Sequence, residues 1–239
     1  MITVPSQHTE SHVTRSMARP SITAAQLIRW SGLVNILAGL LYALETLLHP
    51  ARDISRLALI TQQSVLGVSW YVSHTLGIAA GLLGLLGLIG LYVRQFDKLG
   101  GLGLAGFITA LIGTAMLAGT LVPDAYVFPV LGSRPATAAL LSVPGPFGAY
   151  WVFVAASGLT FVLGTALFSI ASVRARVVSP WGFVLISVGT PLVGFGPLLA
   201  NVLGLIGAVL MGLGYIWLGC ALWKNPGITA APIQAAHGA

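Results

Sequence analysis

The chain has 239 residues, of which 56% are hydrophobic and only 7% are charged. Soluble domains carry roughly 25% charged residues, so this composition excludes an ordinary soluble protein. A net charge of +6 is also found in nucleic-acid-binding proteins, but here the basic residues stand singly beside apolar runs, as they do in membrane proteins. The single cysteine, Cys220, excludes an intramolecular disulfide and a cysteine metal cluster.

The polar ends of the chain flank one long apolar region. Residues 1–22 lack the apolar core of a secretory signal peptide, and we expect a disordered cytoplasmic tail there, with an acid-poor transit peptide as the alternative. Residues 225–239 are rich in Ala, Gly and Pro and are expected to form a second disordered cytoplasmic tail. Residues 23–224 are expected to form a single transmembrane domain.

Six apolar segments are long enough, or nearly so, to span about 30 Å at 1.5 Å per residue. They lie near 24–48, 68–93, 100–122, 150–173, 181–199 and 202–223. The predicted fold is therefore an all-α polytopic membrane helix bundle of six transmembrane helices. The fifth segment contains Pro191 and Pro197 and nearly adjoins the sixth, so five helices plus a re-entrant segment is the alternative.

The basic residues predict the orientation of the bundle. With a cytoplasmic N-terminus, the inner side holds eight of them: Arg15, Arg19, Arg29, Arg94, Lys98, Arg174, Arg176 and Lys224. The outer side holds three: Arg52, Arg56 and Arg134. This bias predicts a multi-pass protein of the plasma membrane with both termini in the cytoplasm.

The two longer loops fall on the outer side. Residues 49–67 are expected to carry a short interfacial helix. Residues 123–149 contain five prolines and three glycines and are expected to form an irregular cap over the outer mouth. The short inner loops predict tight antiparallel hairpins.

Glycine spacing suggests both close helix packing and an internal repeat. Two segments carry glycines at intervals of two to five residues: Gly77, Gly81, Gly84, Gly87 and Gly90, and then Gly204, Gly207, Gly212 and Gly214. Small residues let helix backbones approach closely in lipid. In addition, Gly106-Phe107 precedes Gly113-Thr114 at the spacing by which Gly182-Phe183 precedes Gly189-Thr190. This favours a duplicated hairpin, although similar composition alone also produces such matches.

A polar stripe runs along the first segment. Its members fall within about 100° of arc on a helix: Asn35, Tyr42, Glu45, Thr46 and His49. Because polar groups facing lipid have no partners, this face is expected to point into the bundle. Glu45 lies about one turn from the outer end, and His49 is its i+4 neighbour, so the two could share a proton.

Two further polar residues are predicted to reach the same depth. His74 lies about two turns into the second segment and Asp124 stands where the third leaves the membrane. The set of Glu45, His49, His74 and Asp124 is compatible with a structural hydrogen-bond network, a proton or solute path, a zinc site or haem ligation. The cofactor is unknown, and zinc and haem are the alternatives to none.

Several stretches resemble a broad group of uncharacterised bacterial multi-pass membrane proteins, of the kind common in actinobacteria and chloroflexi. The stretches that carry the resemblance are Leu47-Leu48-His49-Pro50, His74, Gly90 to Gln95, Gly106-Phe107 to Gly113-Thr114, and Leu218 to Trp223. The resemblance spans roughly residues 25–223 and implies no activity and no catalytic residue.

The expected function is a non-enzymatic one. A small-solute or proton-coupled transporter and an accessory or structural membrane subunit are both compatible with the sequence, and a metal- or haem-binding protein or enzyme with an outer site is the alternative. Neither a Gly-x-Ser-x-Gly elbow nor a phosphate-binding loop is present. The expected partner is the lipid bilayer, not nucleic acid, and the glycine-rich helices leave open a homo-oligomer or a partner membrane protein.

Overall fold

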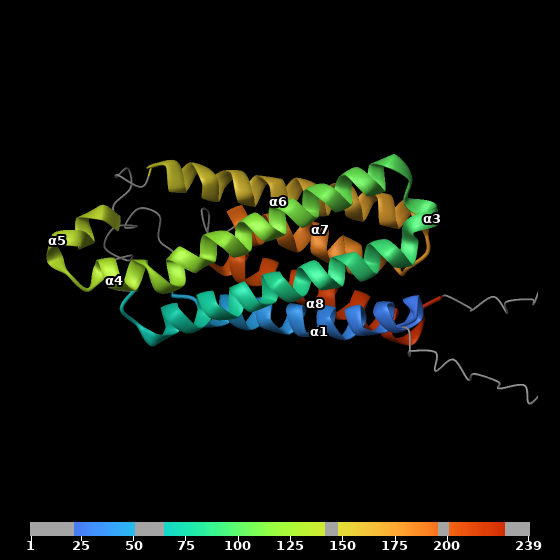
Figure 1. Ribbon diagram of the computed structural model, residues 1–239, viewed down its shortest axis with the longest axis horizontal. Helices are drawn as coiled ribbons and strands as arrows, with labels where there is room; N and C mark the ends of the chain where they lie inside the picture. The colour runs from blue at the N-terminus through green and yellow to red at the C-terminus, as the bar shows by residue number, and fades with distance from the viewer. Residues whose placement is uncertain (1–21, 51–64, 142–147, 196–200, 228–239) are drawn as a thin grey trace, which may run out of the picture.

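The computed structural model describes residues 22–50, 65–141, 148–195 and 201–227, and the secondary structure of these residues is entirely helical. Its elements are α1 (Ala24–Leu48), α3 (Val68–Tyr126), α4 (Phe128–Gly132), α5 (Pro135–Ala138), the 3₁₀ turn η2 (Ala139–Leu141), α6 (Gly148–Ala175), α7 (Pro180–Phe195) and α8 (Asn201–Lys224). The long helices lie roughly along one axis (Figure 1). This confirms the predicted all-α bundle.

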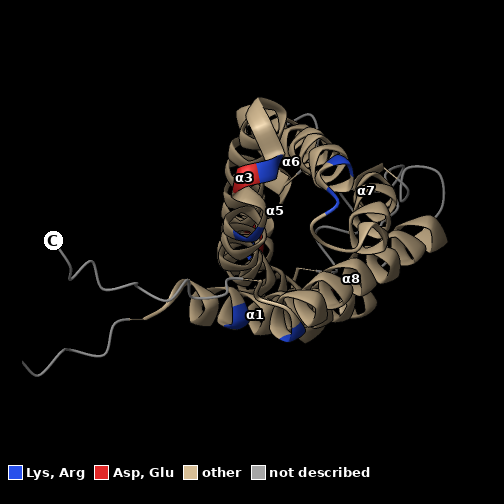
Figure 2. Cartoon of the chain, turned by 90° about the vertical axis from the view of Figure 1, so that its right-hand side faces the viewer, with Lys and Arg blue, Asp and Glu red and all other residues tan. Residues whose placement is uncertain are grey.

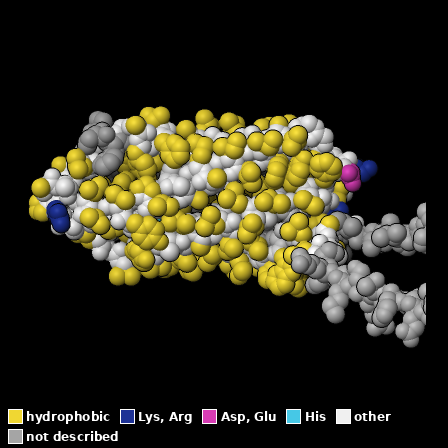
Figure 3. Space-filling model, viewed as in Figure 1, with side chains coloured by type: hydrophobic (Ala, Val, Ile, Leu, Met, Phe, Trp, Pro, Cys, Tyr) yellow, Lys and Arg dark blue, Asp and Glu magenta, His cyan; other side chains and the backbone are white. Residues whose placement is uncertain are grey.

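Four of the described helices are long and apolar enough to cross a membrane: α1, α3 together with α4, α6 and α8. Hydrophobic side chains cover the length of the molecule, and charged ones lie at its two ends in this view (Figure 3). In the most apolar 18-residue stretch of each of these helices, only 33–50% is buried inside the protein. The remaining apolar surface needs a hydrocarbon environment, so this is a membrane protein.

Helix α3 is two antiparallel arms joined at one residue. Gly100 has φ 60° and ψ −167°, a conformation that is essentially restricted to glycine. The first arm (68–99) and the second arm (101–126) lie in contact, since a β-carbon on Gly81 would lie 2.8 Å from that of Ala118. The predicted segments 68–93 and 100–122 were therefore too short: helix replaces most of the expected inner loop, because a single glycine reverses the chain.

The helix ends define two ends of the bundle. The tail end carries the start of α1, the turn of α3 and the end of α8 (Figure 1), and the rings of Trp30 and Trp223 lie 6.5 Å apart. The cap end carries the end of α1, which His49 caps, the end of α3, which contains Asp124, and α4 and α5 (Figure 1). At the tail end, a capping box starts α1: the Thr23 hydroxyl accepts from Gln26 N at 3.2 Å, and the Gln26 side chain accepts from Thr23 N at 2.9 Å.

The cap is more regular than the sequence predicted. The expectation of an irregular loop over 123–149 was wrong for much of its length, because α3 continues through Pro123 to Tyr126 and α4, α5 and η2 follow. Pro129 and Pro135 stand in the first turn of α4 and α5, where the missing N–H costs nothing. The interfacial helix expected within 49–67 falls mainly on 51–64, outside the described residues.

Helix α7 is the short member of the bundle. Its 16 residues extend about 24 Å, less than the roughly 30 Å of a bilayer core. The predicted segment 181–199 runs on into residues 196–200, which lie outside the described part of the chain. The alternatives of a full span and a re-entrant segment therefore both remain.

Glycines bring the helices of the bundle together in a ring. Viewed along its axis, the bundle shows α1, α3, α6, α7 and α8 around a centre, with Lys and Arg at helix ends (Figure 2). Helix α8 has two glycine faces. A β-carbon on Gly219 would lie 2.5 Å from the Gly32 carbonyl oxygen of α1, and one on Gly214 would lie 2.7 Å from the Gly182 oxygen of α7. The predicted glycine packing is thus used within the chain.

The two matching glycine motifs occupy comparable places. Gly106 and Gly113 face the backbone of α6, and Gly182 and Gly189 face α8, the next helix in each case. The threonines after the second glycine, Thr114 and Thr190, are both buried, and each donates to the carbonyl four residues earlier at 2.7 Å. This likeness favours the duplicated hairpin.

Close packing at Gly106 predicts a sharp difference between two Gly→Ala variants of the second arm. Gly106→Ala places a methyl group 2.5 Å from Phe168 N of α6, and we expect a loss of about 1–3 kcal/mol in unfolding free energy from overpacking. Gly119→Ala is the matched control, because its methyl group has nothing within 4 Å. Thermal unfolding in detergent measures both. Equal midpoints for the two variants would contradict the packing described here.

Candidate functional site

The carboxylate of Asp124, at the cap end of the second arm, is held by groups from two helices. Tyr150 of α6 donates its hydroxyl to Asp124 Oδ1 at 2.6 Å, and His74 Nε2 of the first arm lies 3.9 Å from Oδ2. The Trp70 indole N–H donates to the Asp124 backbone oxygen at 2.6 Å. Asp124 is therefore a partly buried residue bonded to its neighbours at this end, and not a solvated loop residue.

Two imidazoles lie beside this carboxylate, with their ring planes tilted by 51° to each other. The rings of His49 and His74 lie 4.9 Å apart, and that of Trp70 lies 4.2 Å from His74 and 5.6 Å from His49. His74 Nδ1 lies 2.7 Å from the Trp70 carbonyl oxygen, and His49 Nδ1 lies 2.7 Å from that of Pro50. Because a carbonyl only accepts, each Nδ1 carries the hydrogen. Nε2 is then the atom of each ring that gains or loses a proton, and in His74 it faces Asp124.

Glu45 adds a second carboxylate at nearly the same depth. Its side chain is buried, and the Thr46 hydroxyl donates to Glu45 Oε2 at 2.8 Å. A β-carbon on Gly77 would lie 3.2 Å from Glu45 Cγ, and Gly77 is only one turn from His74 on the first arm. The structure thus brings the predicted set of Glu45, His49, His74 and Asp124 to one layer at the cap end.

The rest of the predicted stripe continues from this layer toward the tail end. Asn35 is fully buried against Gly87, and Tyr42 is buried over Gly84 with its ring 5.5 Å from that of Tyr215. Thr46 is partly buried. The stripe faces the first arm of α3, so it points into the bundle as lipid requires.

Two residues of the site were not predicted as such. Trp70 and Tyr150 belong to an aromatic cluster with Phe128. Their polar atoms nevertheless bind Asp124, which is 54 and 26 residues away in sequence. The available signal was an aromatic residue with a polar group, predicted to lie at the same depth as the Asp124 carboxylate.

The residues of this layer do not fit haem. Axial ligation by a histidine pair requires the macrocycle to lie between the two rings. The centroids of His49 and His74 are only 4.9 Å apart, and the rings contact each other directly. Among the described residues, no group of three or more His, Cys, Asp or Glu side chains is arranged to hold a metal ion.

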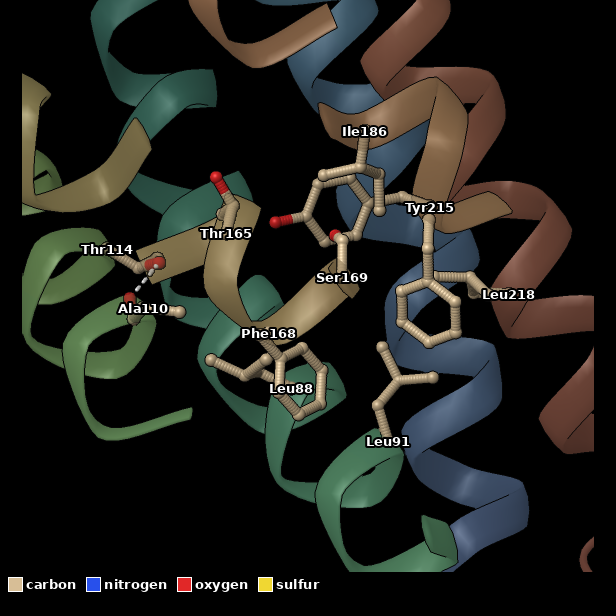
Figure 4. A pocket seen from close by; sticks show the side chains of 11 residues that line it. Leu88, Leu91, Ala110, Thr114, Thr165, Phe168, Ser169, Ile186, Tyr215 and Leu218 are labelled. Atoms are coloured by element: carbon tan, nitrogen blue, oxygen red, sulfur yellow. Dashed lines mark hydrogen bonds between the residues drawn. The ribbon is translucent and has the colours of Figure 1, made fainter. Parts of the chain in front are cut away.

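A small cavity lies deeper in the bundle, between α3, α6, α7 and α8. Its volume is about 20 Å³, which is enough for about one water molecule. The lining is mostly apolar, with a few hydroxyls, and Figure 4 shows the Tyr215 hydroxyl directed toward Thr165. The Thr114 hydroxyl is already bonded to the Ala110 oxygen at 2.7 Å. A solute larger than water has no room here.

No protein-family model, no curated protein and no solved structure matches this chain.

The Tyr150–Asp124 bond predicts a specific stability loss. Tyr150→Phe removes the hydroxyl that donates to the Asp124 carboxylate, and we expect the unfolding free energy to fall by about 1.5–3 kcal/mol, the range for hydrogen bonds to charged groups. Tyr71→Phe is the control, because Tyr71 is half exposed and its ring packs edge-on against Tyr126, a contact that the loss of its hydroxyl leaves in place. Chemical denaturation in detergent compares them. A Tyr150→Phe protein as stable as Tyr71→Phe would show that this bond contributes nothing.

Proposed function

We propose that this chain is a non-enzymatic, multi-pass membrane protein that binds and releases protons at its cap end, as a proton-coupled transporter does. The observation that carries the proposal is the position of the His74 imidazole. Its Nε2 atom lies 3.9 Å from Asp124 Oδ2, and its ring lies 4.9 Å from that of His49. Imidazole is the side chain whose ordinary titration falls near neutral pH.

The chemistry of the layer supports proton exchange over simple packing. His74 and Asp124 are a base and an acid at ion-pair distance, with Nε2 of the imidazole 3.9 Å from Oδ2 of the carboxylate. A second imidazole in ring contact and a second carboxylate one turn away couple further sites to this one. Groups so close do not titrate independently.

A second candidate is an accessory or structural membrane subunit. It is favoured by the interior beneath the site, where helices meet at glycine backbones and the central cavity holds about one water molecule. Such an interior supports neither a channel nor a carrier for larger solutes in this conformation. The two candidates differ in whether the cap-end layer exchanges protons.

The proposed topology has six spans in the plasma membrane, with both termini in the cytoplasm. There are six apolar helices if the two arms of α3 are counted separately and α7 is included. Both described ends of the chain lie at the tail end, where Arg94 Nε also donates to the Asn225 oxygen at 3.2 Å. Most of the basic residues of the sequence belong to the segments expected on this side, which supports a cytoplasmic tail end. The proposed partner is the bilayer itself.

This topology predicts the accessibility of single cysteines. In a Cys220→Ser background, Glu10→Cys and Ala230→Cys should resist a membrane-impermeant maleimide in intact cells and react after permeabilisation. Arg134→Cys, at an exposed position of the cap, should react in intact cells and serves as the positive control. Labelling of either tail in intact cells would overturn the orientation.

Proton binding at the cap end predicts coupled titration of two histidines. In nuclear magnetic resonance spectra of ring-labelled histidine, His49 and His74 should titrate together over a broadened or two-step curve. Asp124→Asn should change the curve of His74, whereas the histidines of the tails should keep simple curves. A simple curve for His74 that Asp124→Asn leaves unchanged would refute the proposed function and favour the structural subunit.

A further inference from the structure

A row of buried polar groups leads from the cap-end layer toward the tail end. On α1 these groups are Ser31, Asn35, Tyr42 and Glu45, none of them more than 8% exposed. All four face the first arm of α3, opposite glycines. Such a line of polar groups inside a membrane bundle needs an explanation, because each one must be kept from lipid.

The polar groups of this row lie against glycines at regular depths. Glu45 lies against Gly77, the Tyr42 hydroxyl near Gly81 and Gly84, Asn35 against Gly87 and Ser31 against Gly90. These glycines are three or four residues apart, so neighbouring levels differ by about 4.5–6 Å. One water molecule with a hydrogen bond on each side covers roughly that separation. The polar groups therefore recur at intervals that single waters can bridge.

One member of this interface lacks hydrogen-bond partners among the described residues. Neither polar atom of the Asn35 side chain makes a hydrogen bond there, although the residue is fully buried. Buried amides are normally satisfied by protein or water, so Asn35 points to bound water between α1 and the first arm.

We propose that water between α1 and the first arm of α3 forms a proton path from the cap-end layer, past Asn35, to Ser31 near the tail end. The inference rests on the proposed proton binding at Glu45 and His74. The only co-reactant is water: each molecule accepts a proton on one side and releases another on the other side. Asn35 and Ser31 orient the waters and are not ionised.

The glycine stripe explains how a closely packed interface admits water. Opposite the row of polar groups the first arm presents glycines, which have no side chains. A small separation of α1 from the first arm therefore opens a continuous polar groove. A methyl group at Gly84 would lie 3.6 Å from the Tyr42 hydroxyl, an ordinary contact distance. It would occupy the groove without forcing the helices apart. The central cavity, on the other side of Tyr215, is the competing route.

The test is proton flux into vesicles that contain the purified full-length protein. A potential set by potassium and valinomycin drives protons into phosphatidylcholine–phosphatidylglycerol vesicles, and trapped pyranine reports the internal pH. We expect flux above that of protein-free vesicles, lowered at least about tenfold (about 1.4 kcal/mol in the barrier) by Asn35→Leu and by Gly84→Ala. Asn35→Ser, which restores a hydrogen-bonding group, should retain flux.

The controls separate this path from its competitor and from misfolding. Ser169→Thr adds one methyl group, about the size of a water molecule, to the central cavity that Ser169 lines, and Gly119→Ala adds a lipid-facing methyl group; neither should change the flux. If Asn35→Leu does not fold, Gly84→Ala carries the test. Wild-type flux no faster than that of protein-free vesicles overturns the path. So does a block by Ser169→Thr with Asn35→Leu unaffected. The histidine titration, measured on the same samples, shows whether the cap-end site itself stands.

Discussion

Backbone contact at glycine is the interaction on which this structure depends. In lipid, one apolar helix gains nothing from burying its side chains against another, so association relies on close packing and hydrogen bonds. Here the contacts are between backbones: Gly39 meets the Gly212 oxygen, and Gly207 meets the Gly189 oxygen. Because α8 carries one glycine face for α1 and another for α7, it links the two ends of the chain into one ring.

The polar layer at the cap end depends on that same packing. Glu45 reaches the level of His74 only because Gly77 lets α1 lie against the first arm. The return of the chain at Gly100 then brings the second arm, with Asp124, back to His74. Residues 45, 74 and 124 meet although no local motif joins them. An aromatic cluster that includes Trp70, Phe128 and Tyr150 covers this end of the bundle.

The sequence was informative where a pattern has only one physical solution. Long apolar runs in a chain with 7% charge must be membrane helices, and a polar stripe such as Asn35, Tyr42 and Glu45 must face inward. The exact ends of α3 were not predictable, because the length of an inner turn depends on whether a glycine adopts positive φ. Helices α4 and α5 were missed because proline is common both in loops and in the first turn of a helix, so their prolines did not distinguish the two. Tyr150 was missed because its partner depends on the packing of α6 on the second arm.

The same constraint links architecture with the chemistry that we propose. A membrane protein that needs a stable, dry interior has no use for an asparagine fully buried against a helix backbone, since leucine or alanine would pack there without a polar group to satisfy. Asn35 is retained opposite Gly87, where the facing helix offers no side chain to bond it. Glycine thus serves two purposes along the first arm. It allows the close approach that holds α1 in place, and it leaves a surface without side chains opposite Asn35. In the path that we propose, the helix contact that builds the cap-end site is also the contact through which that site reaches the other side of the membrane.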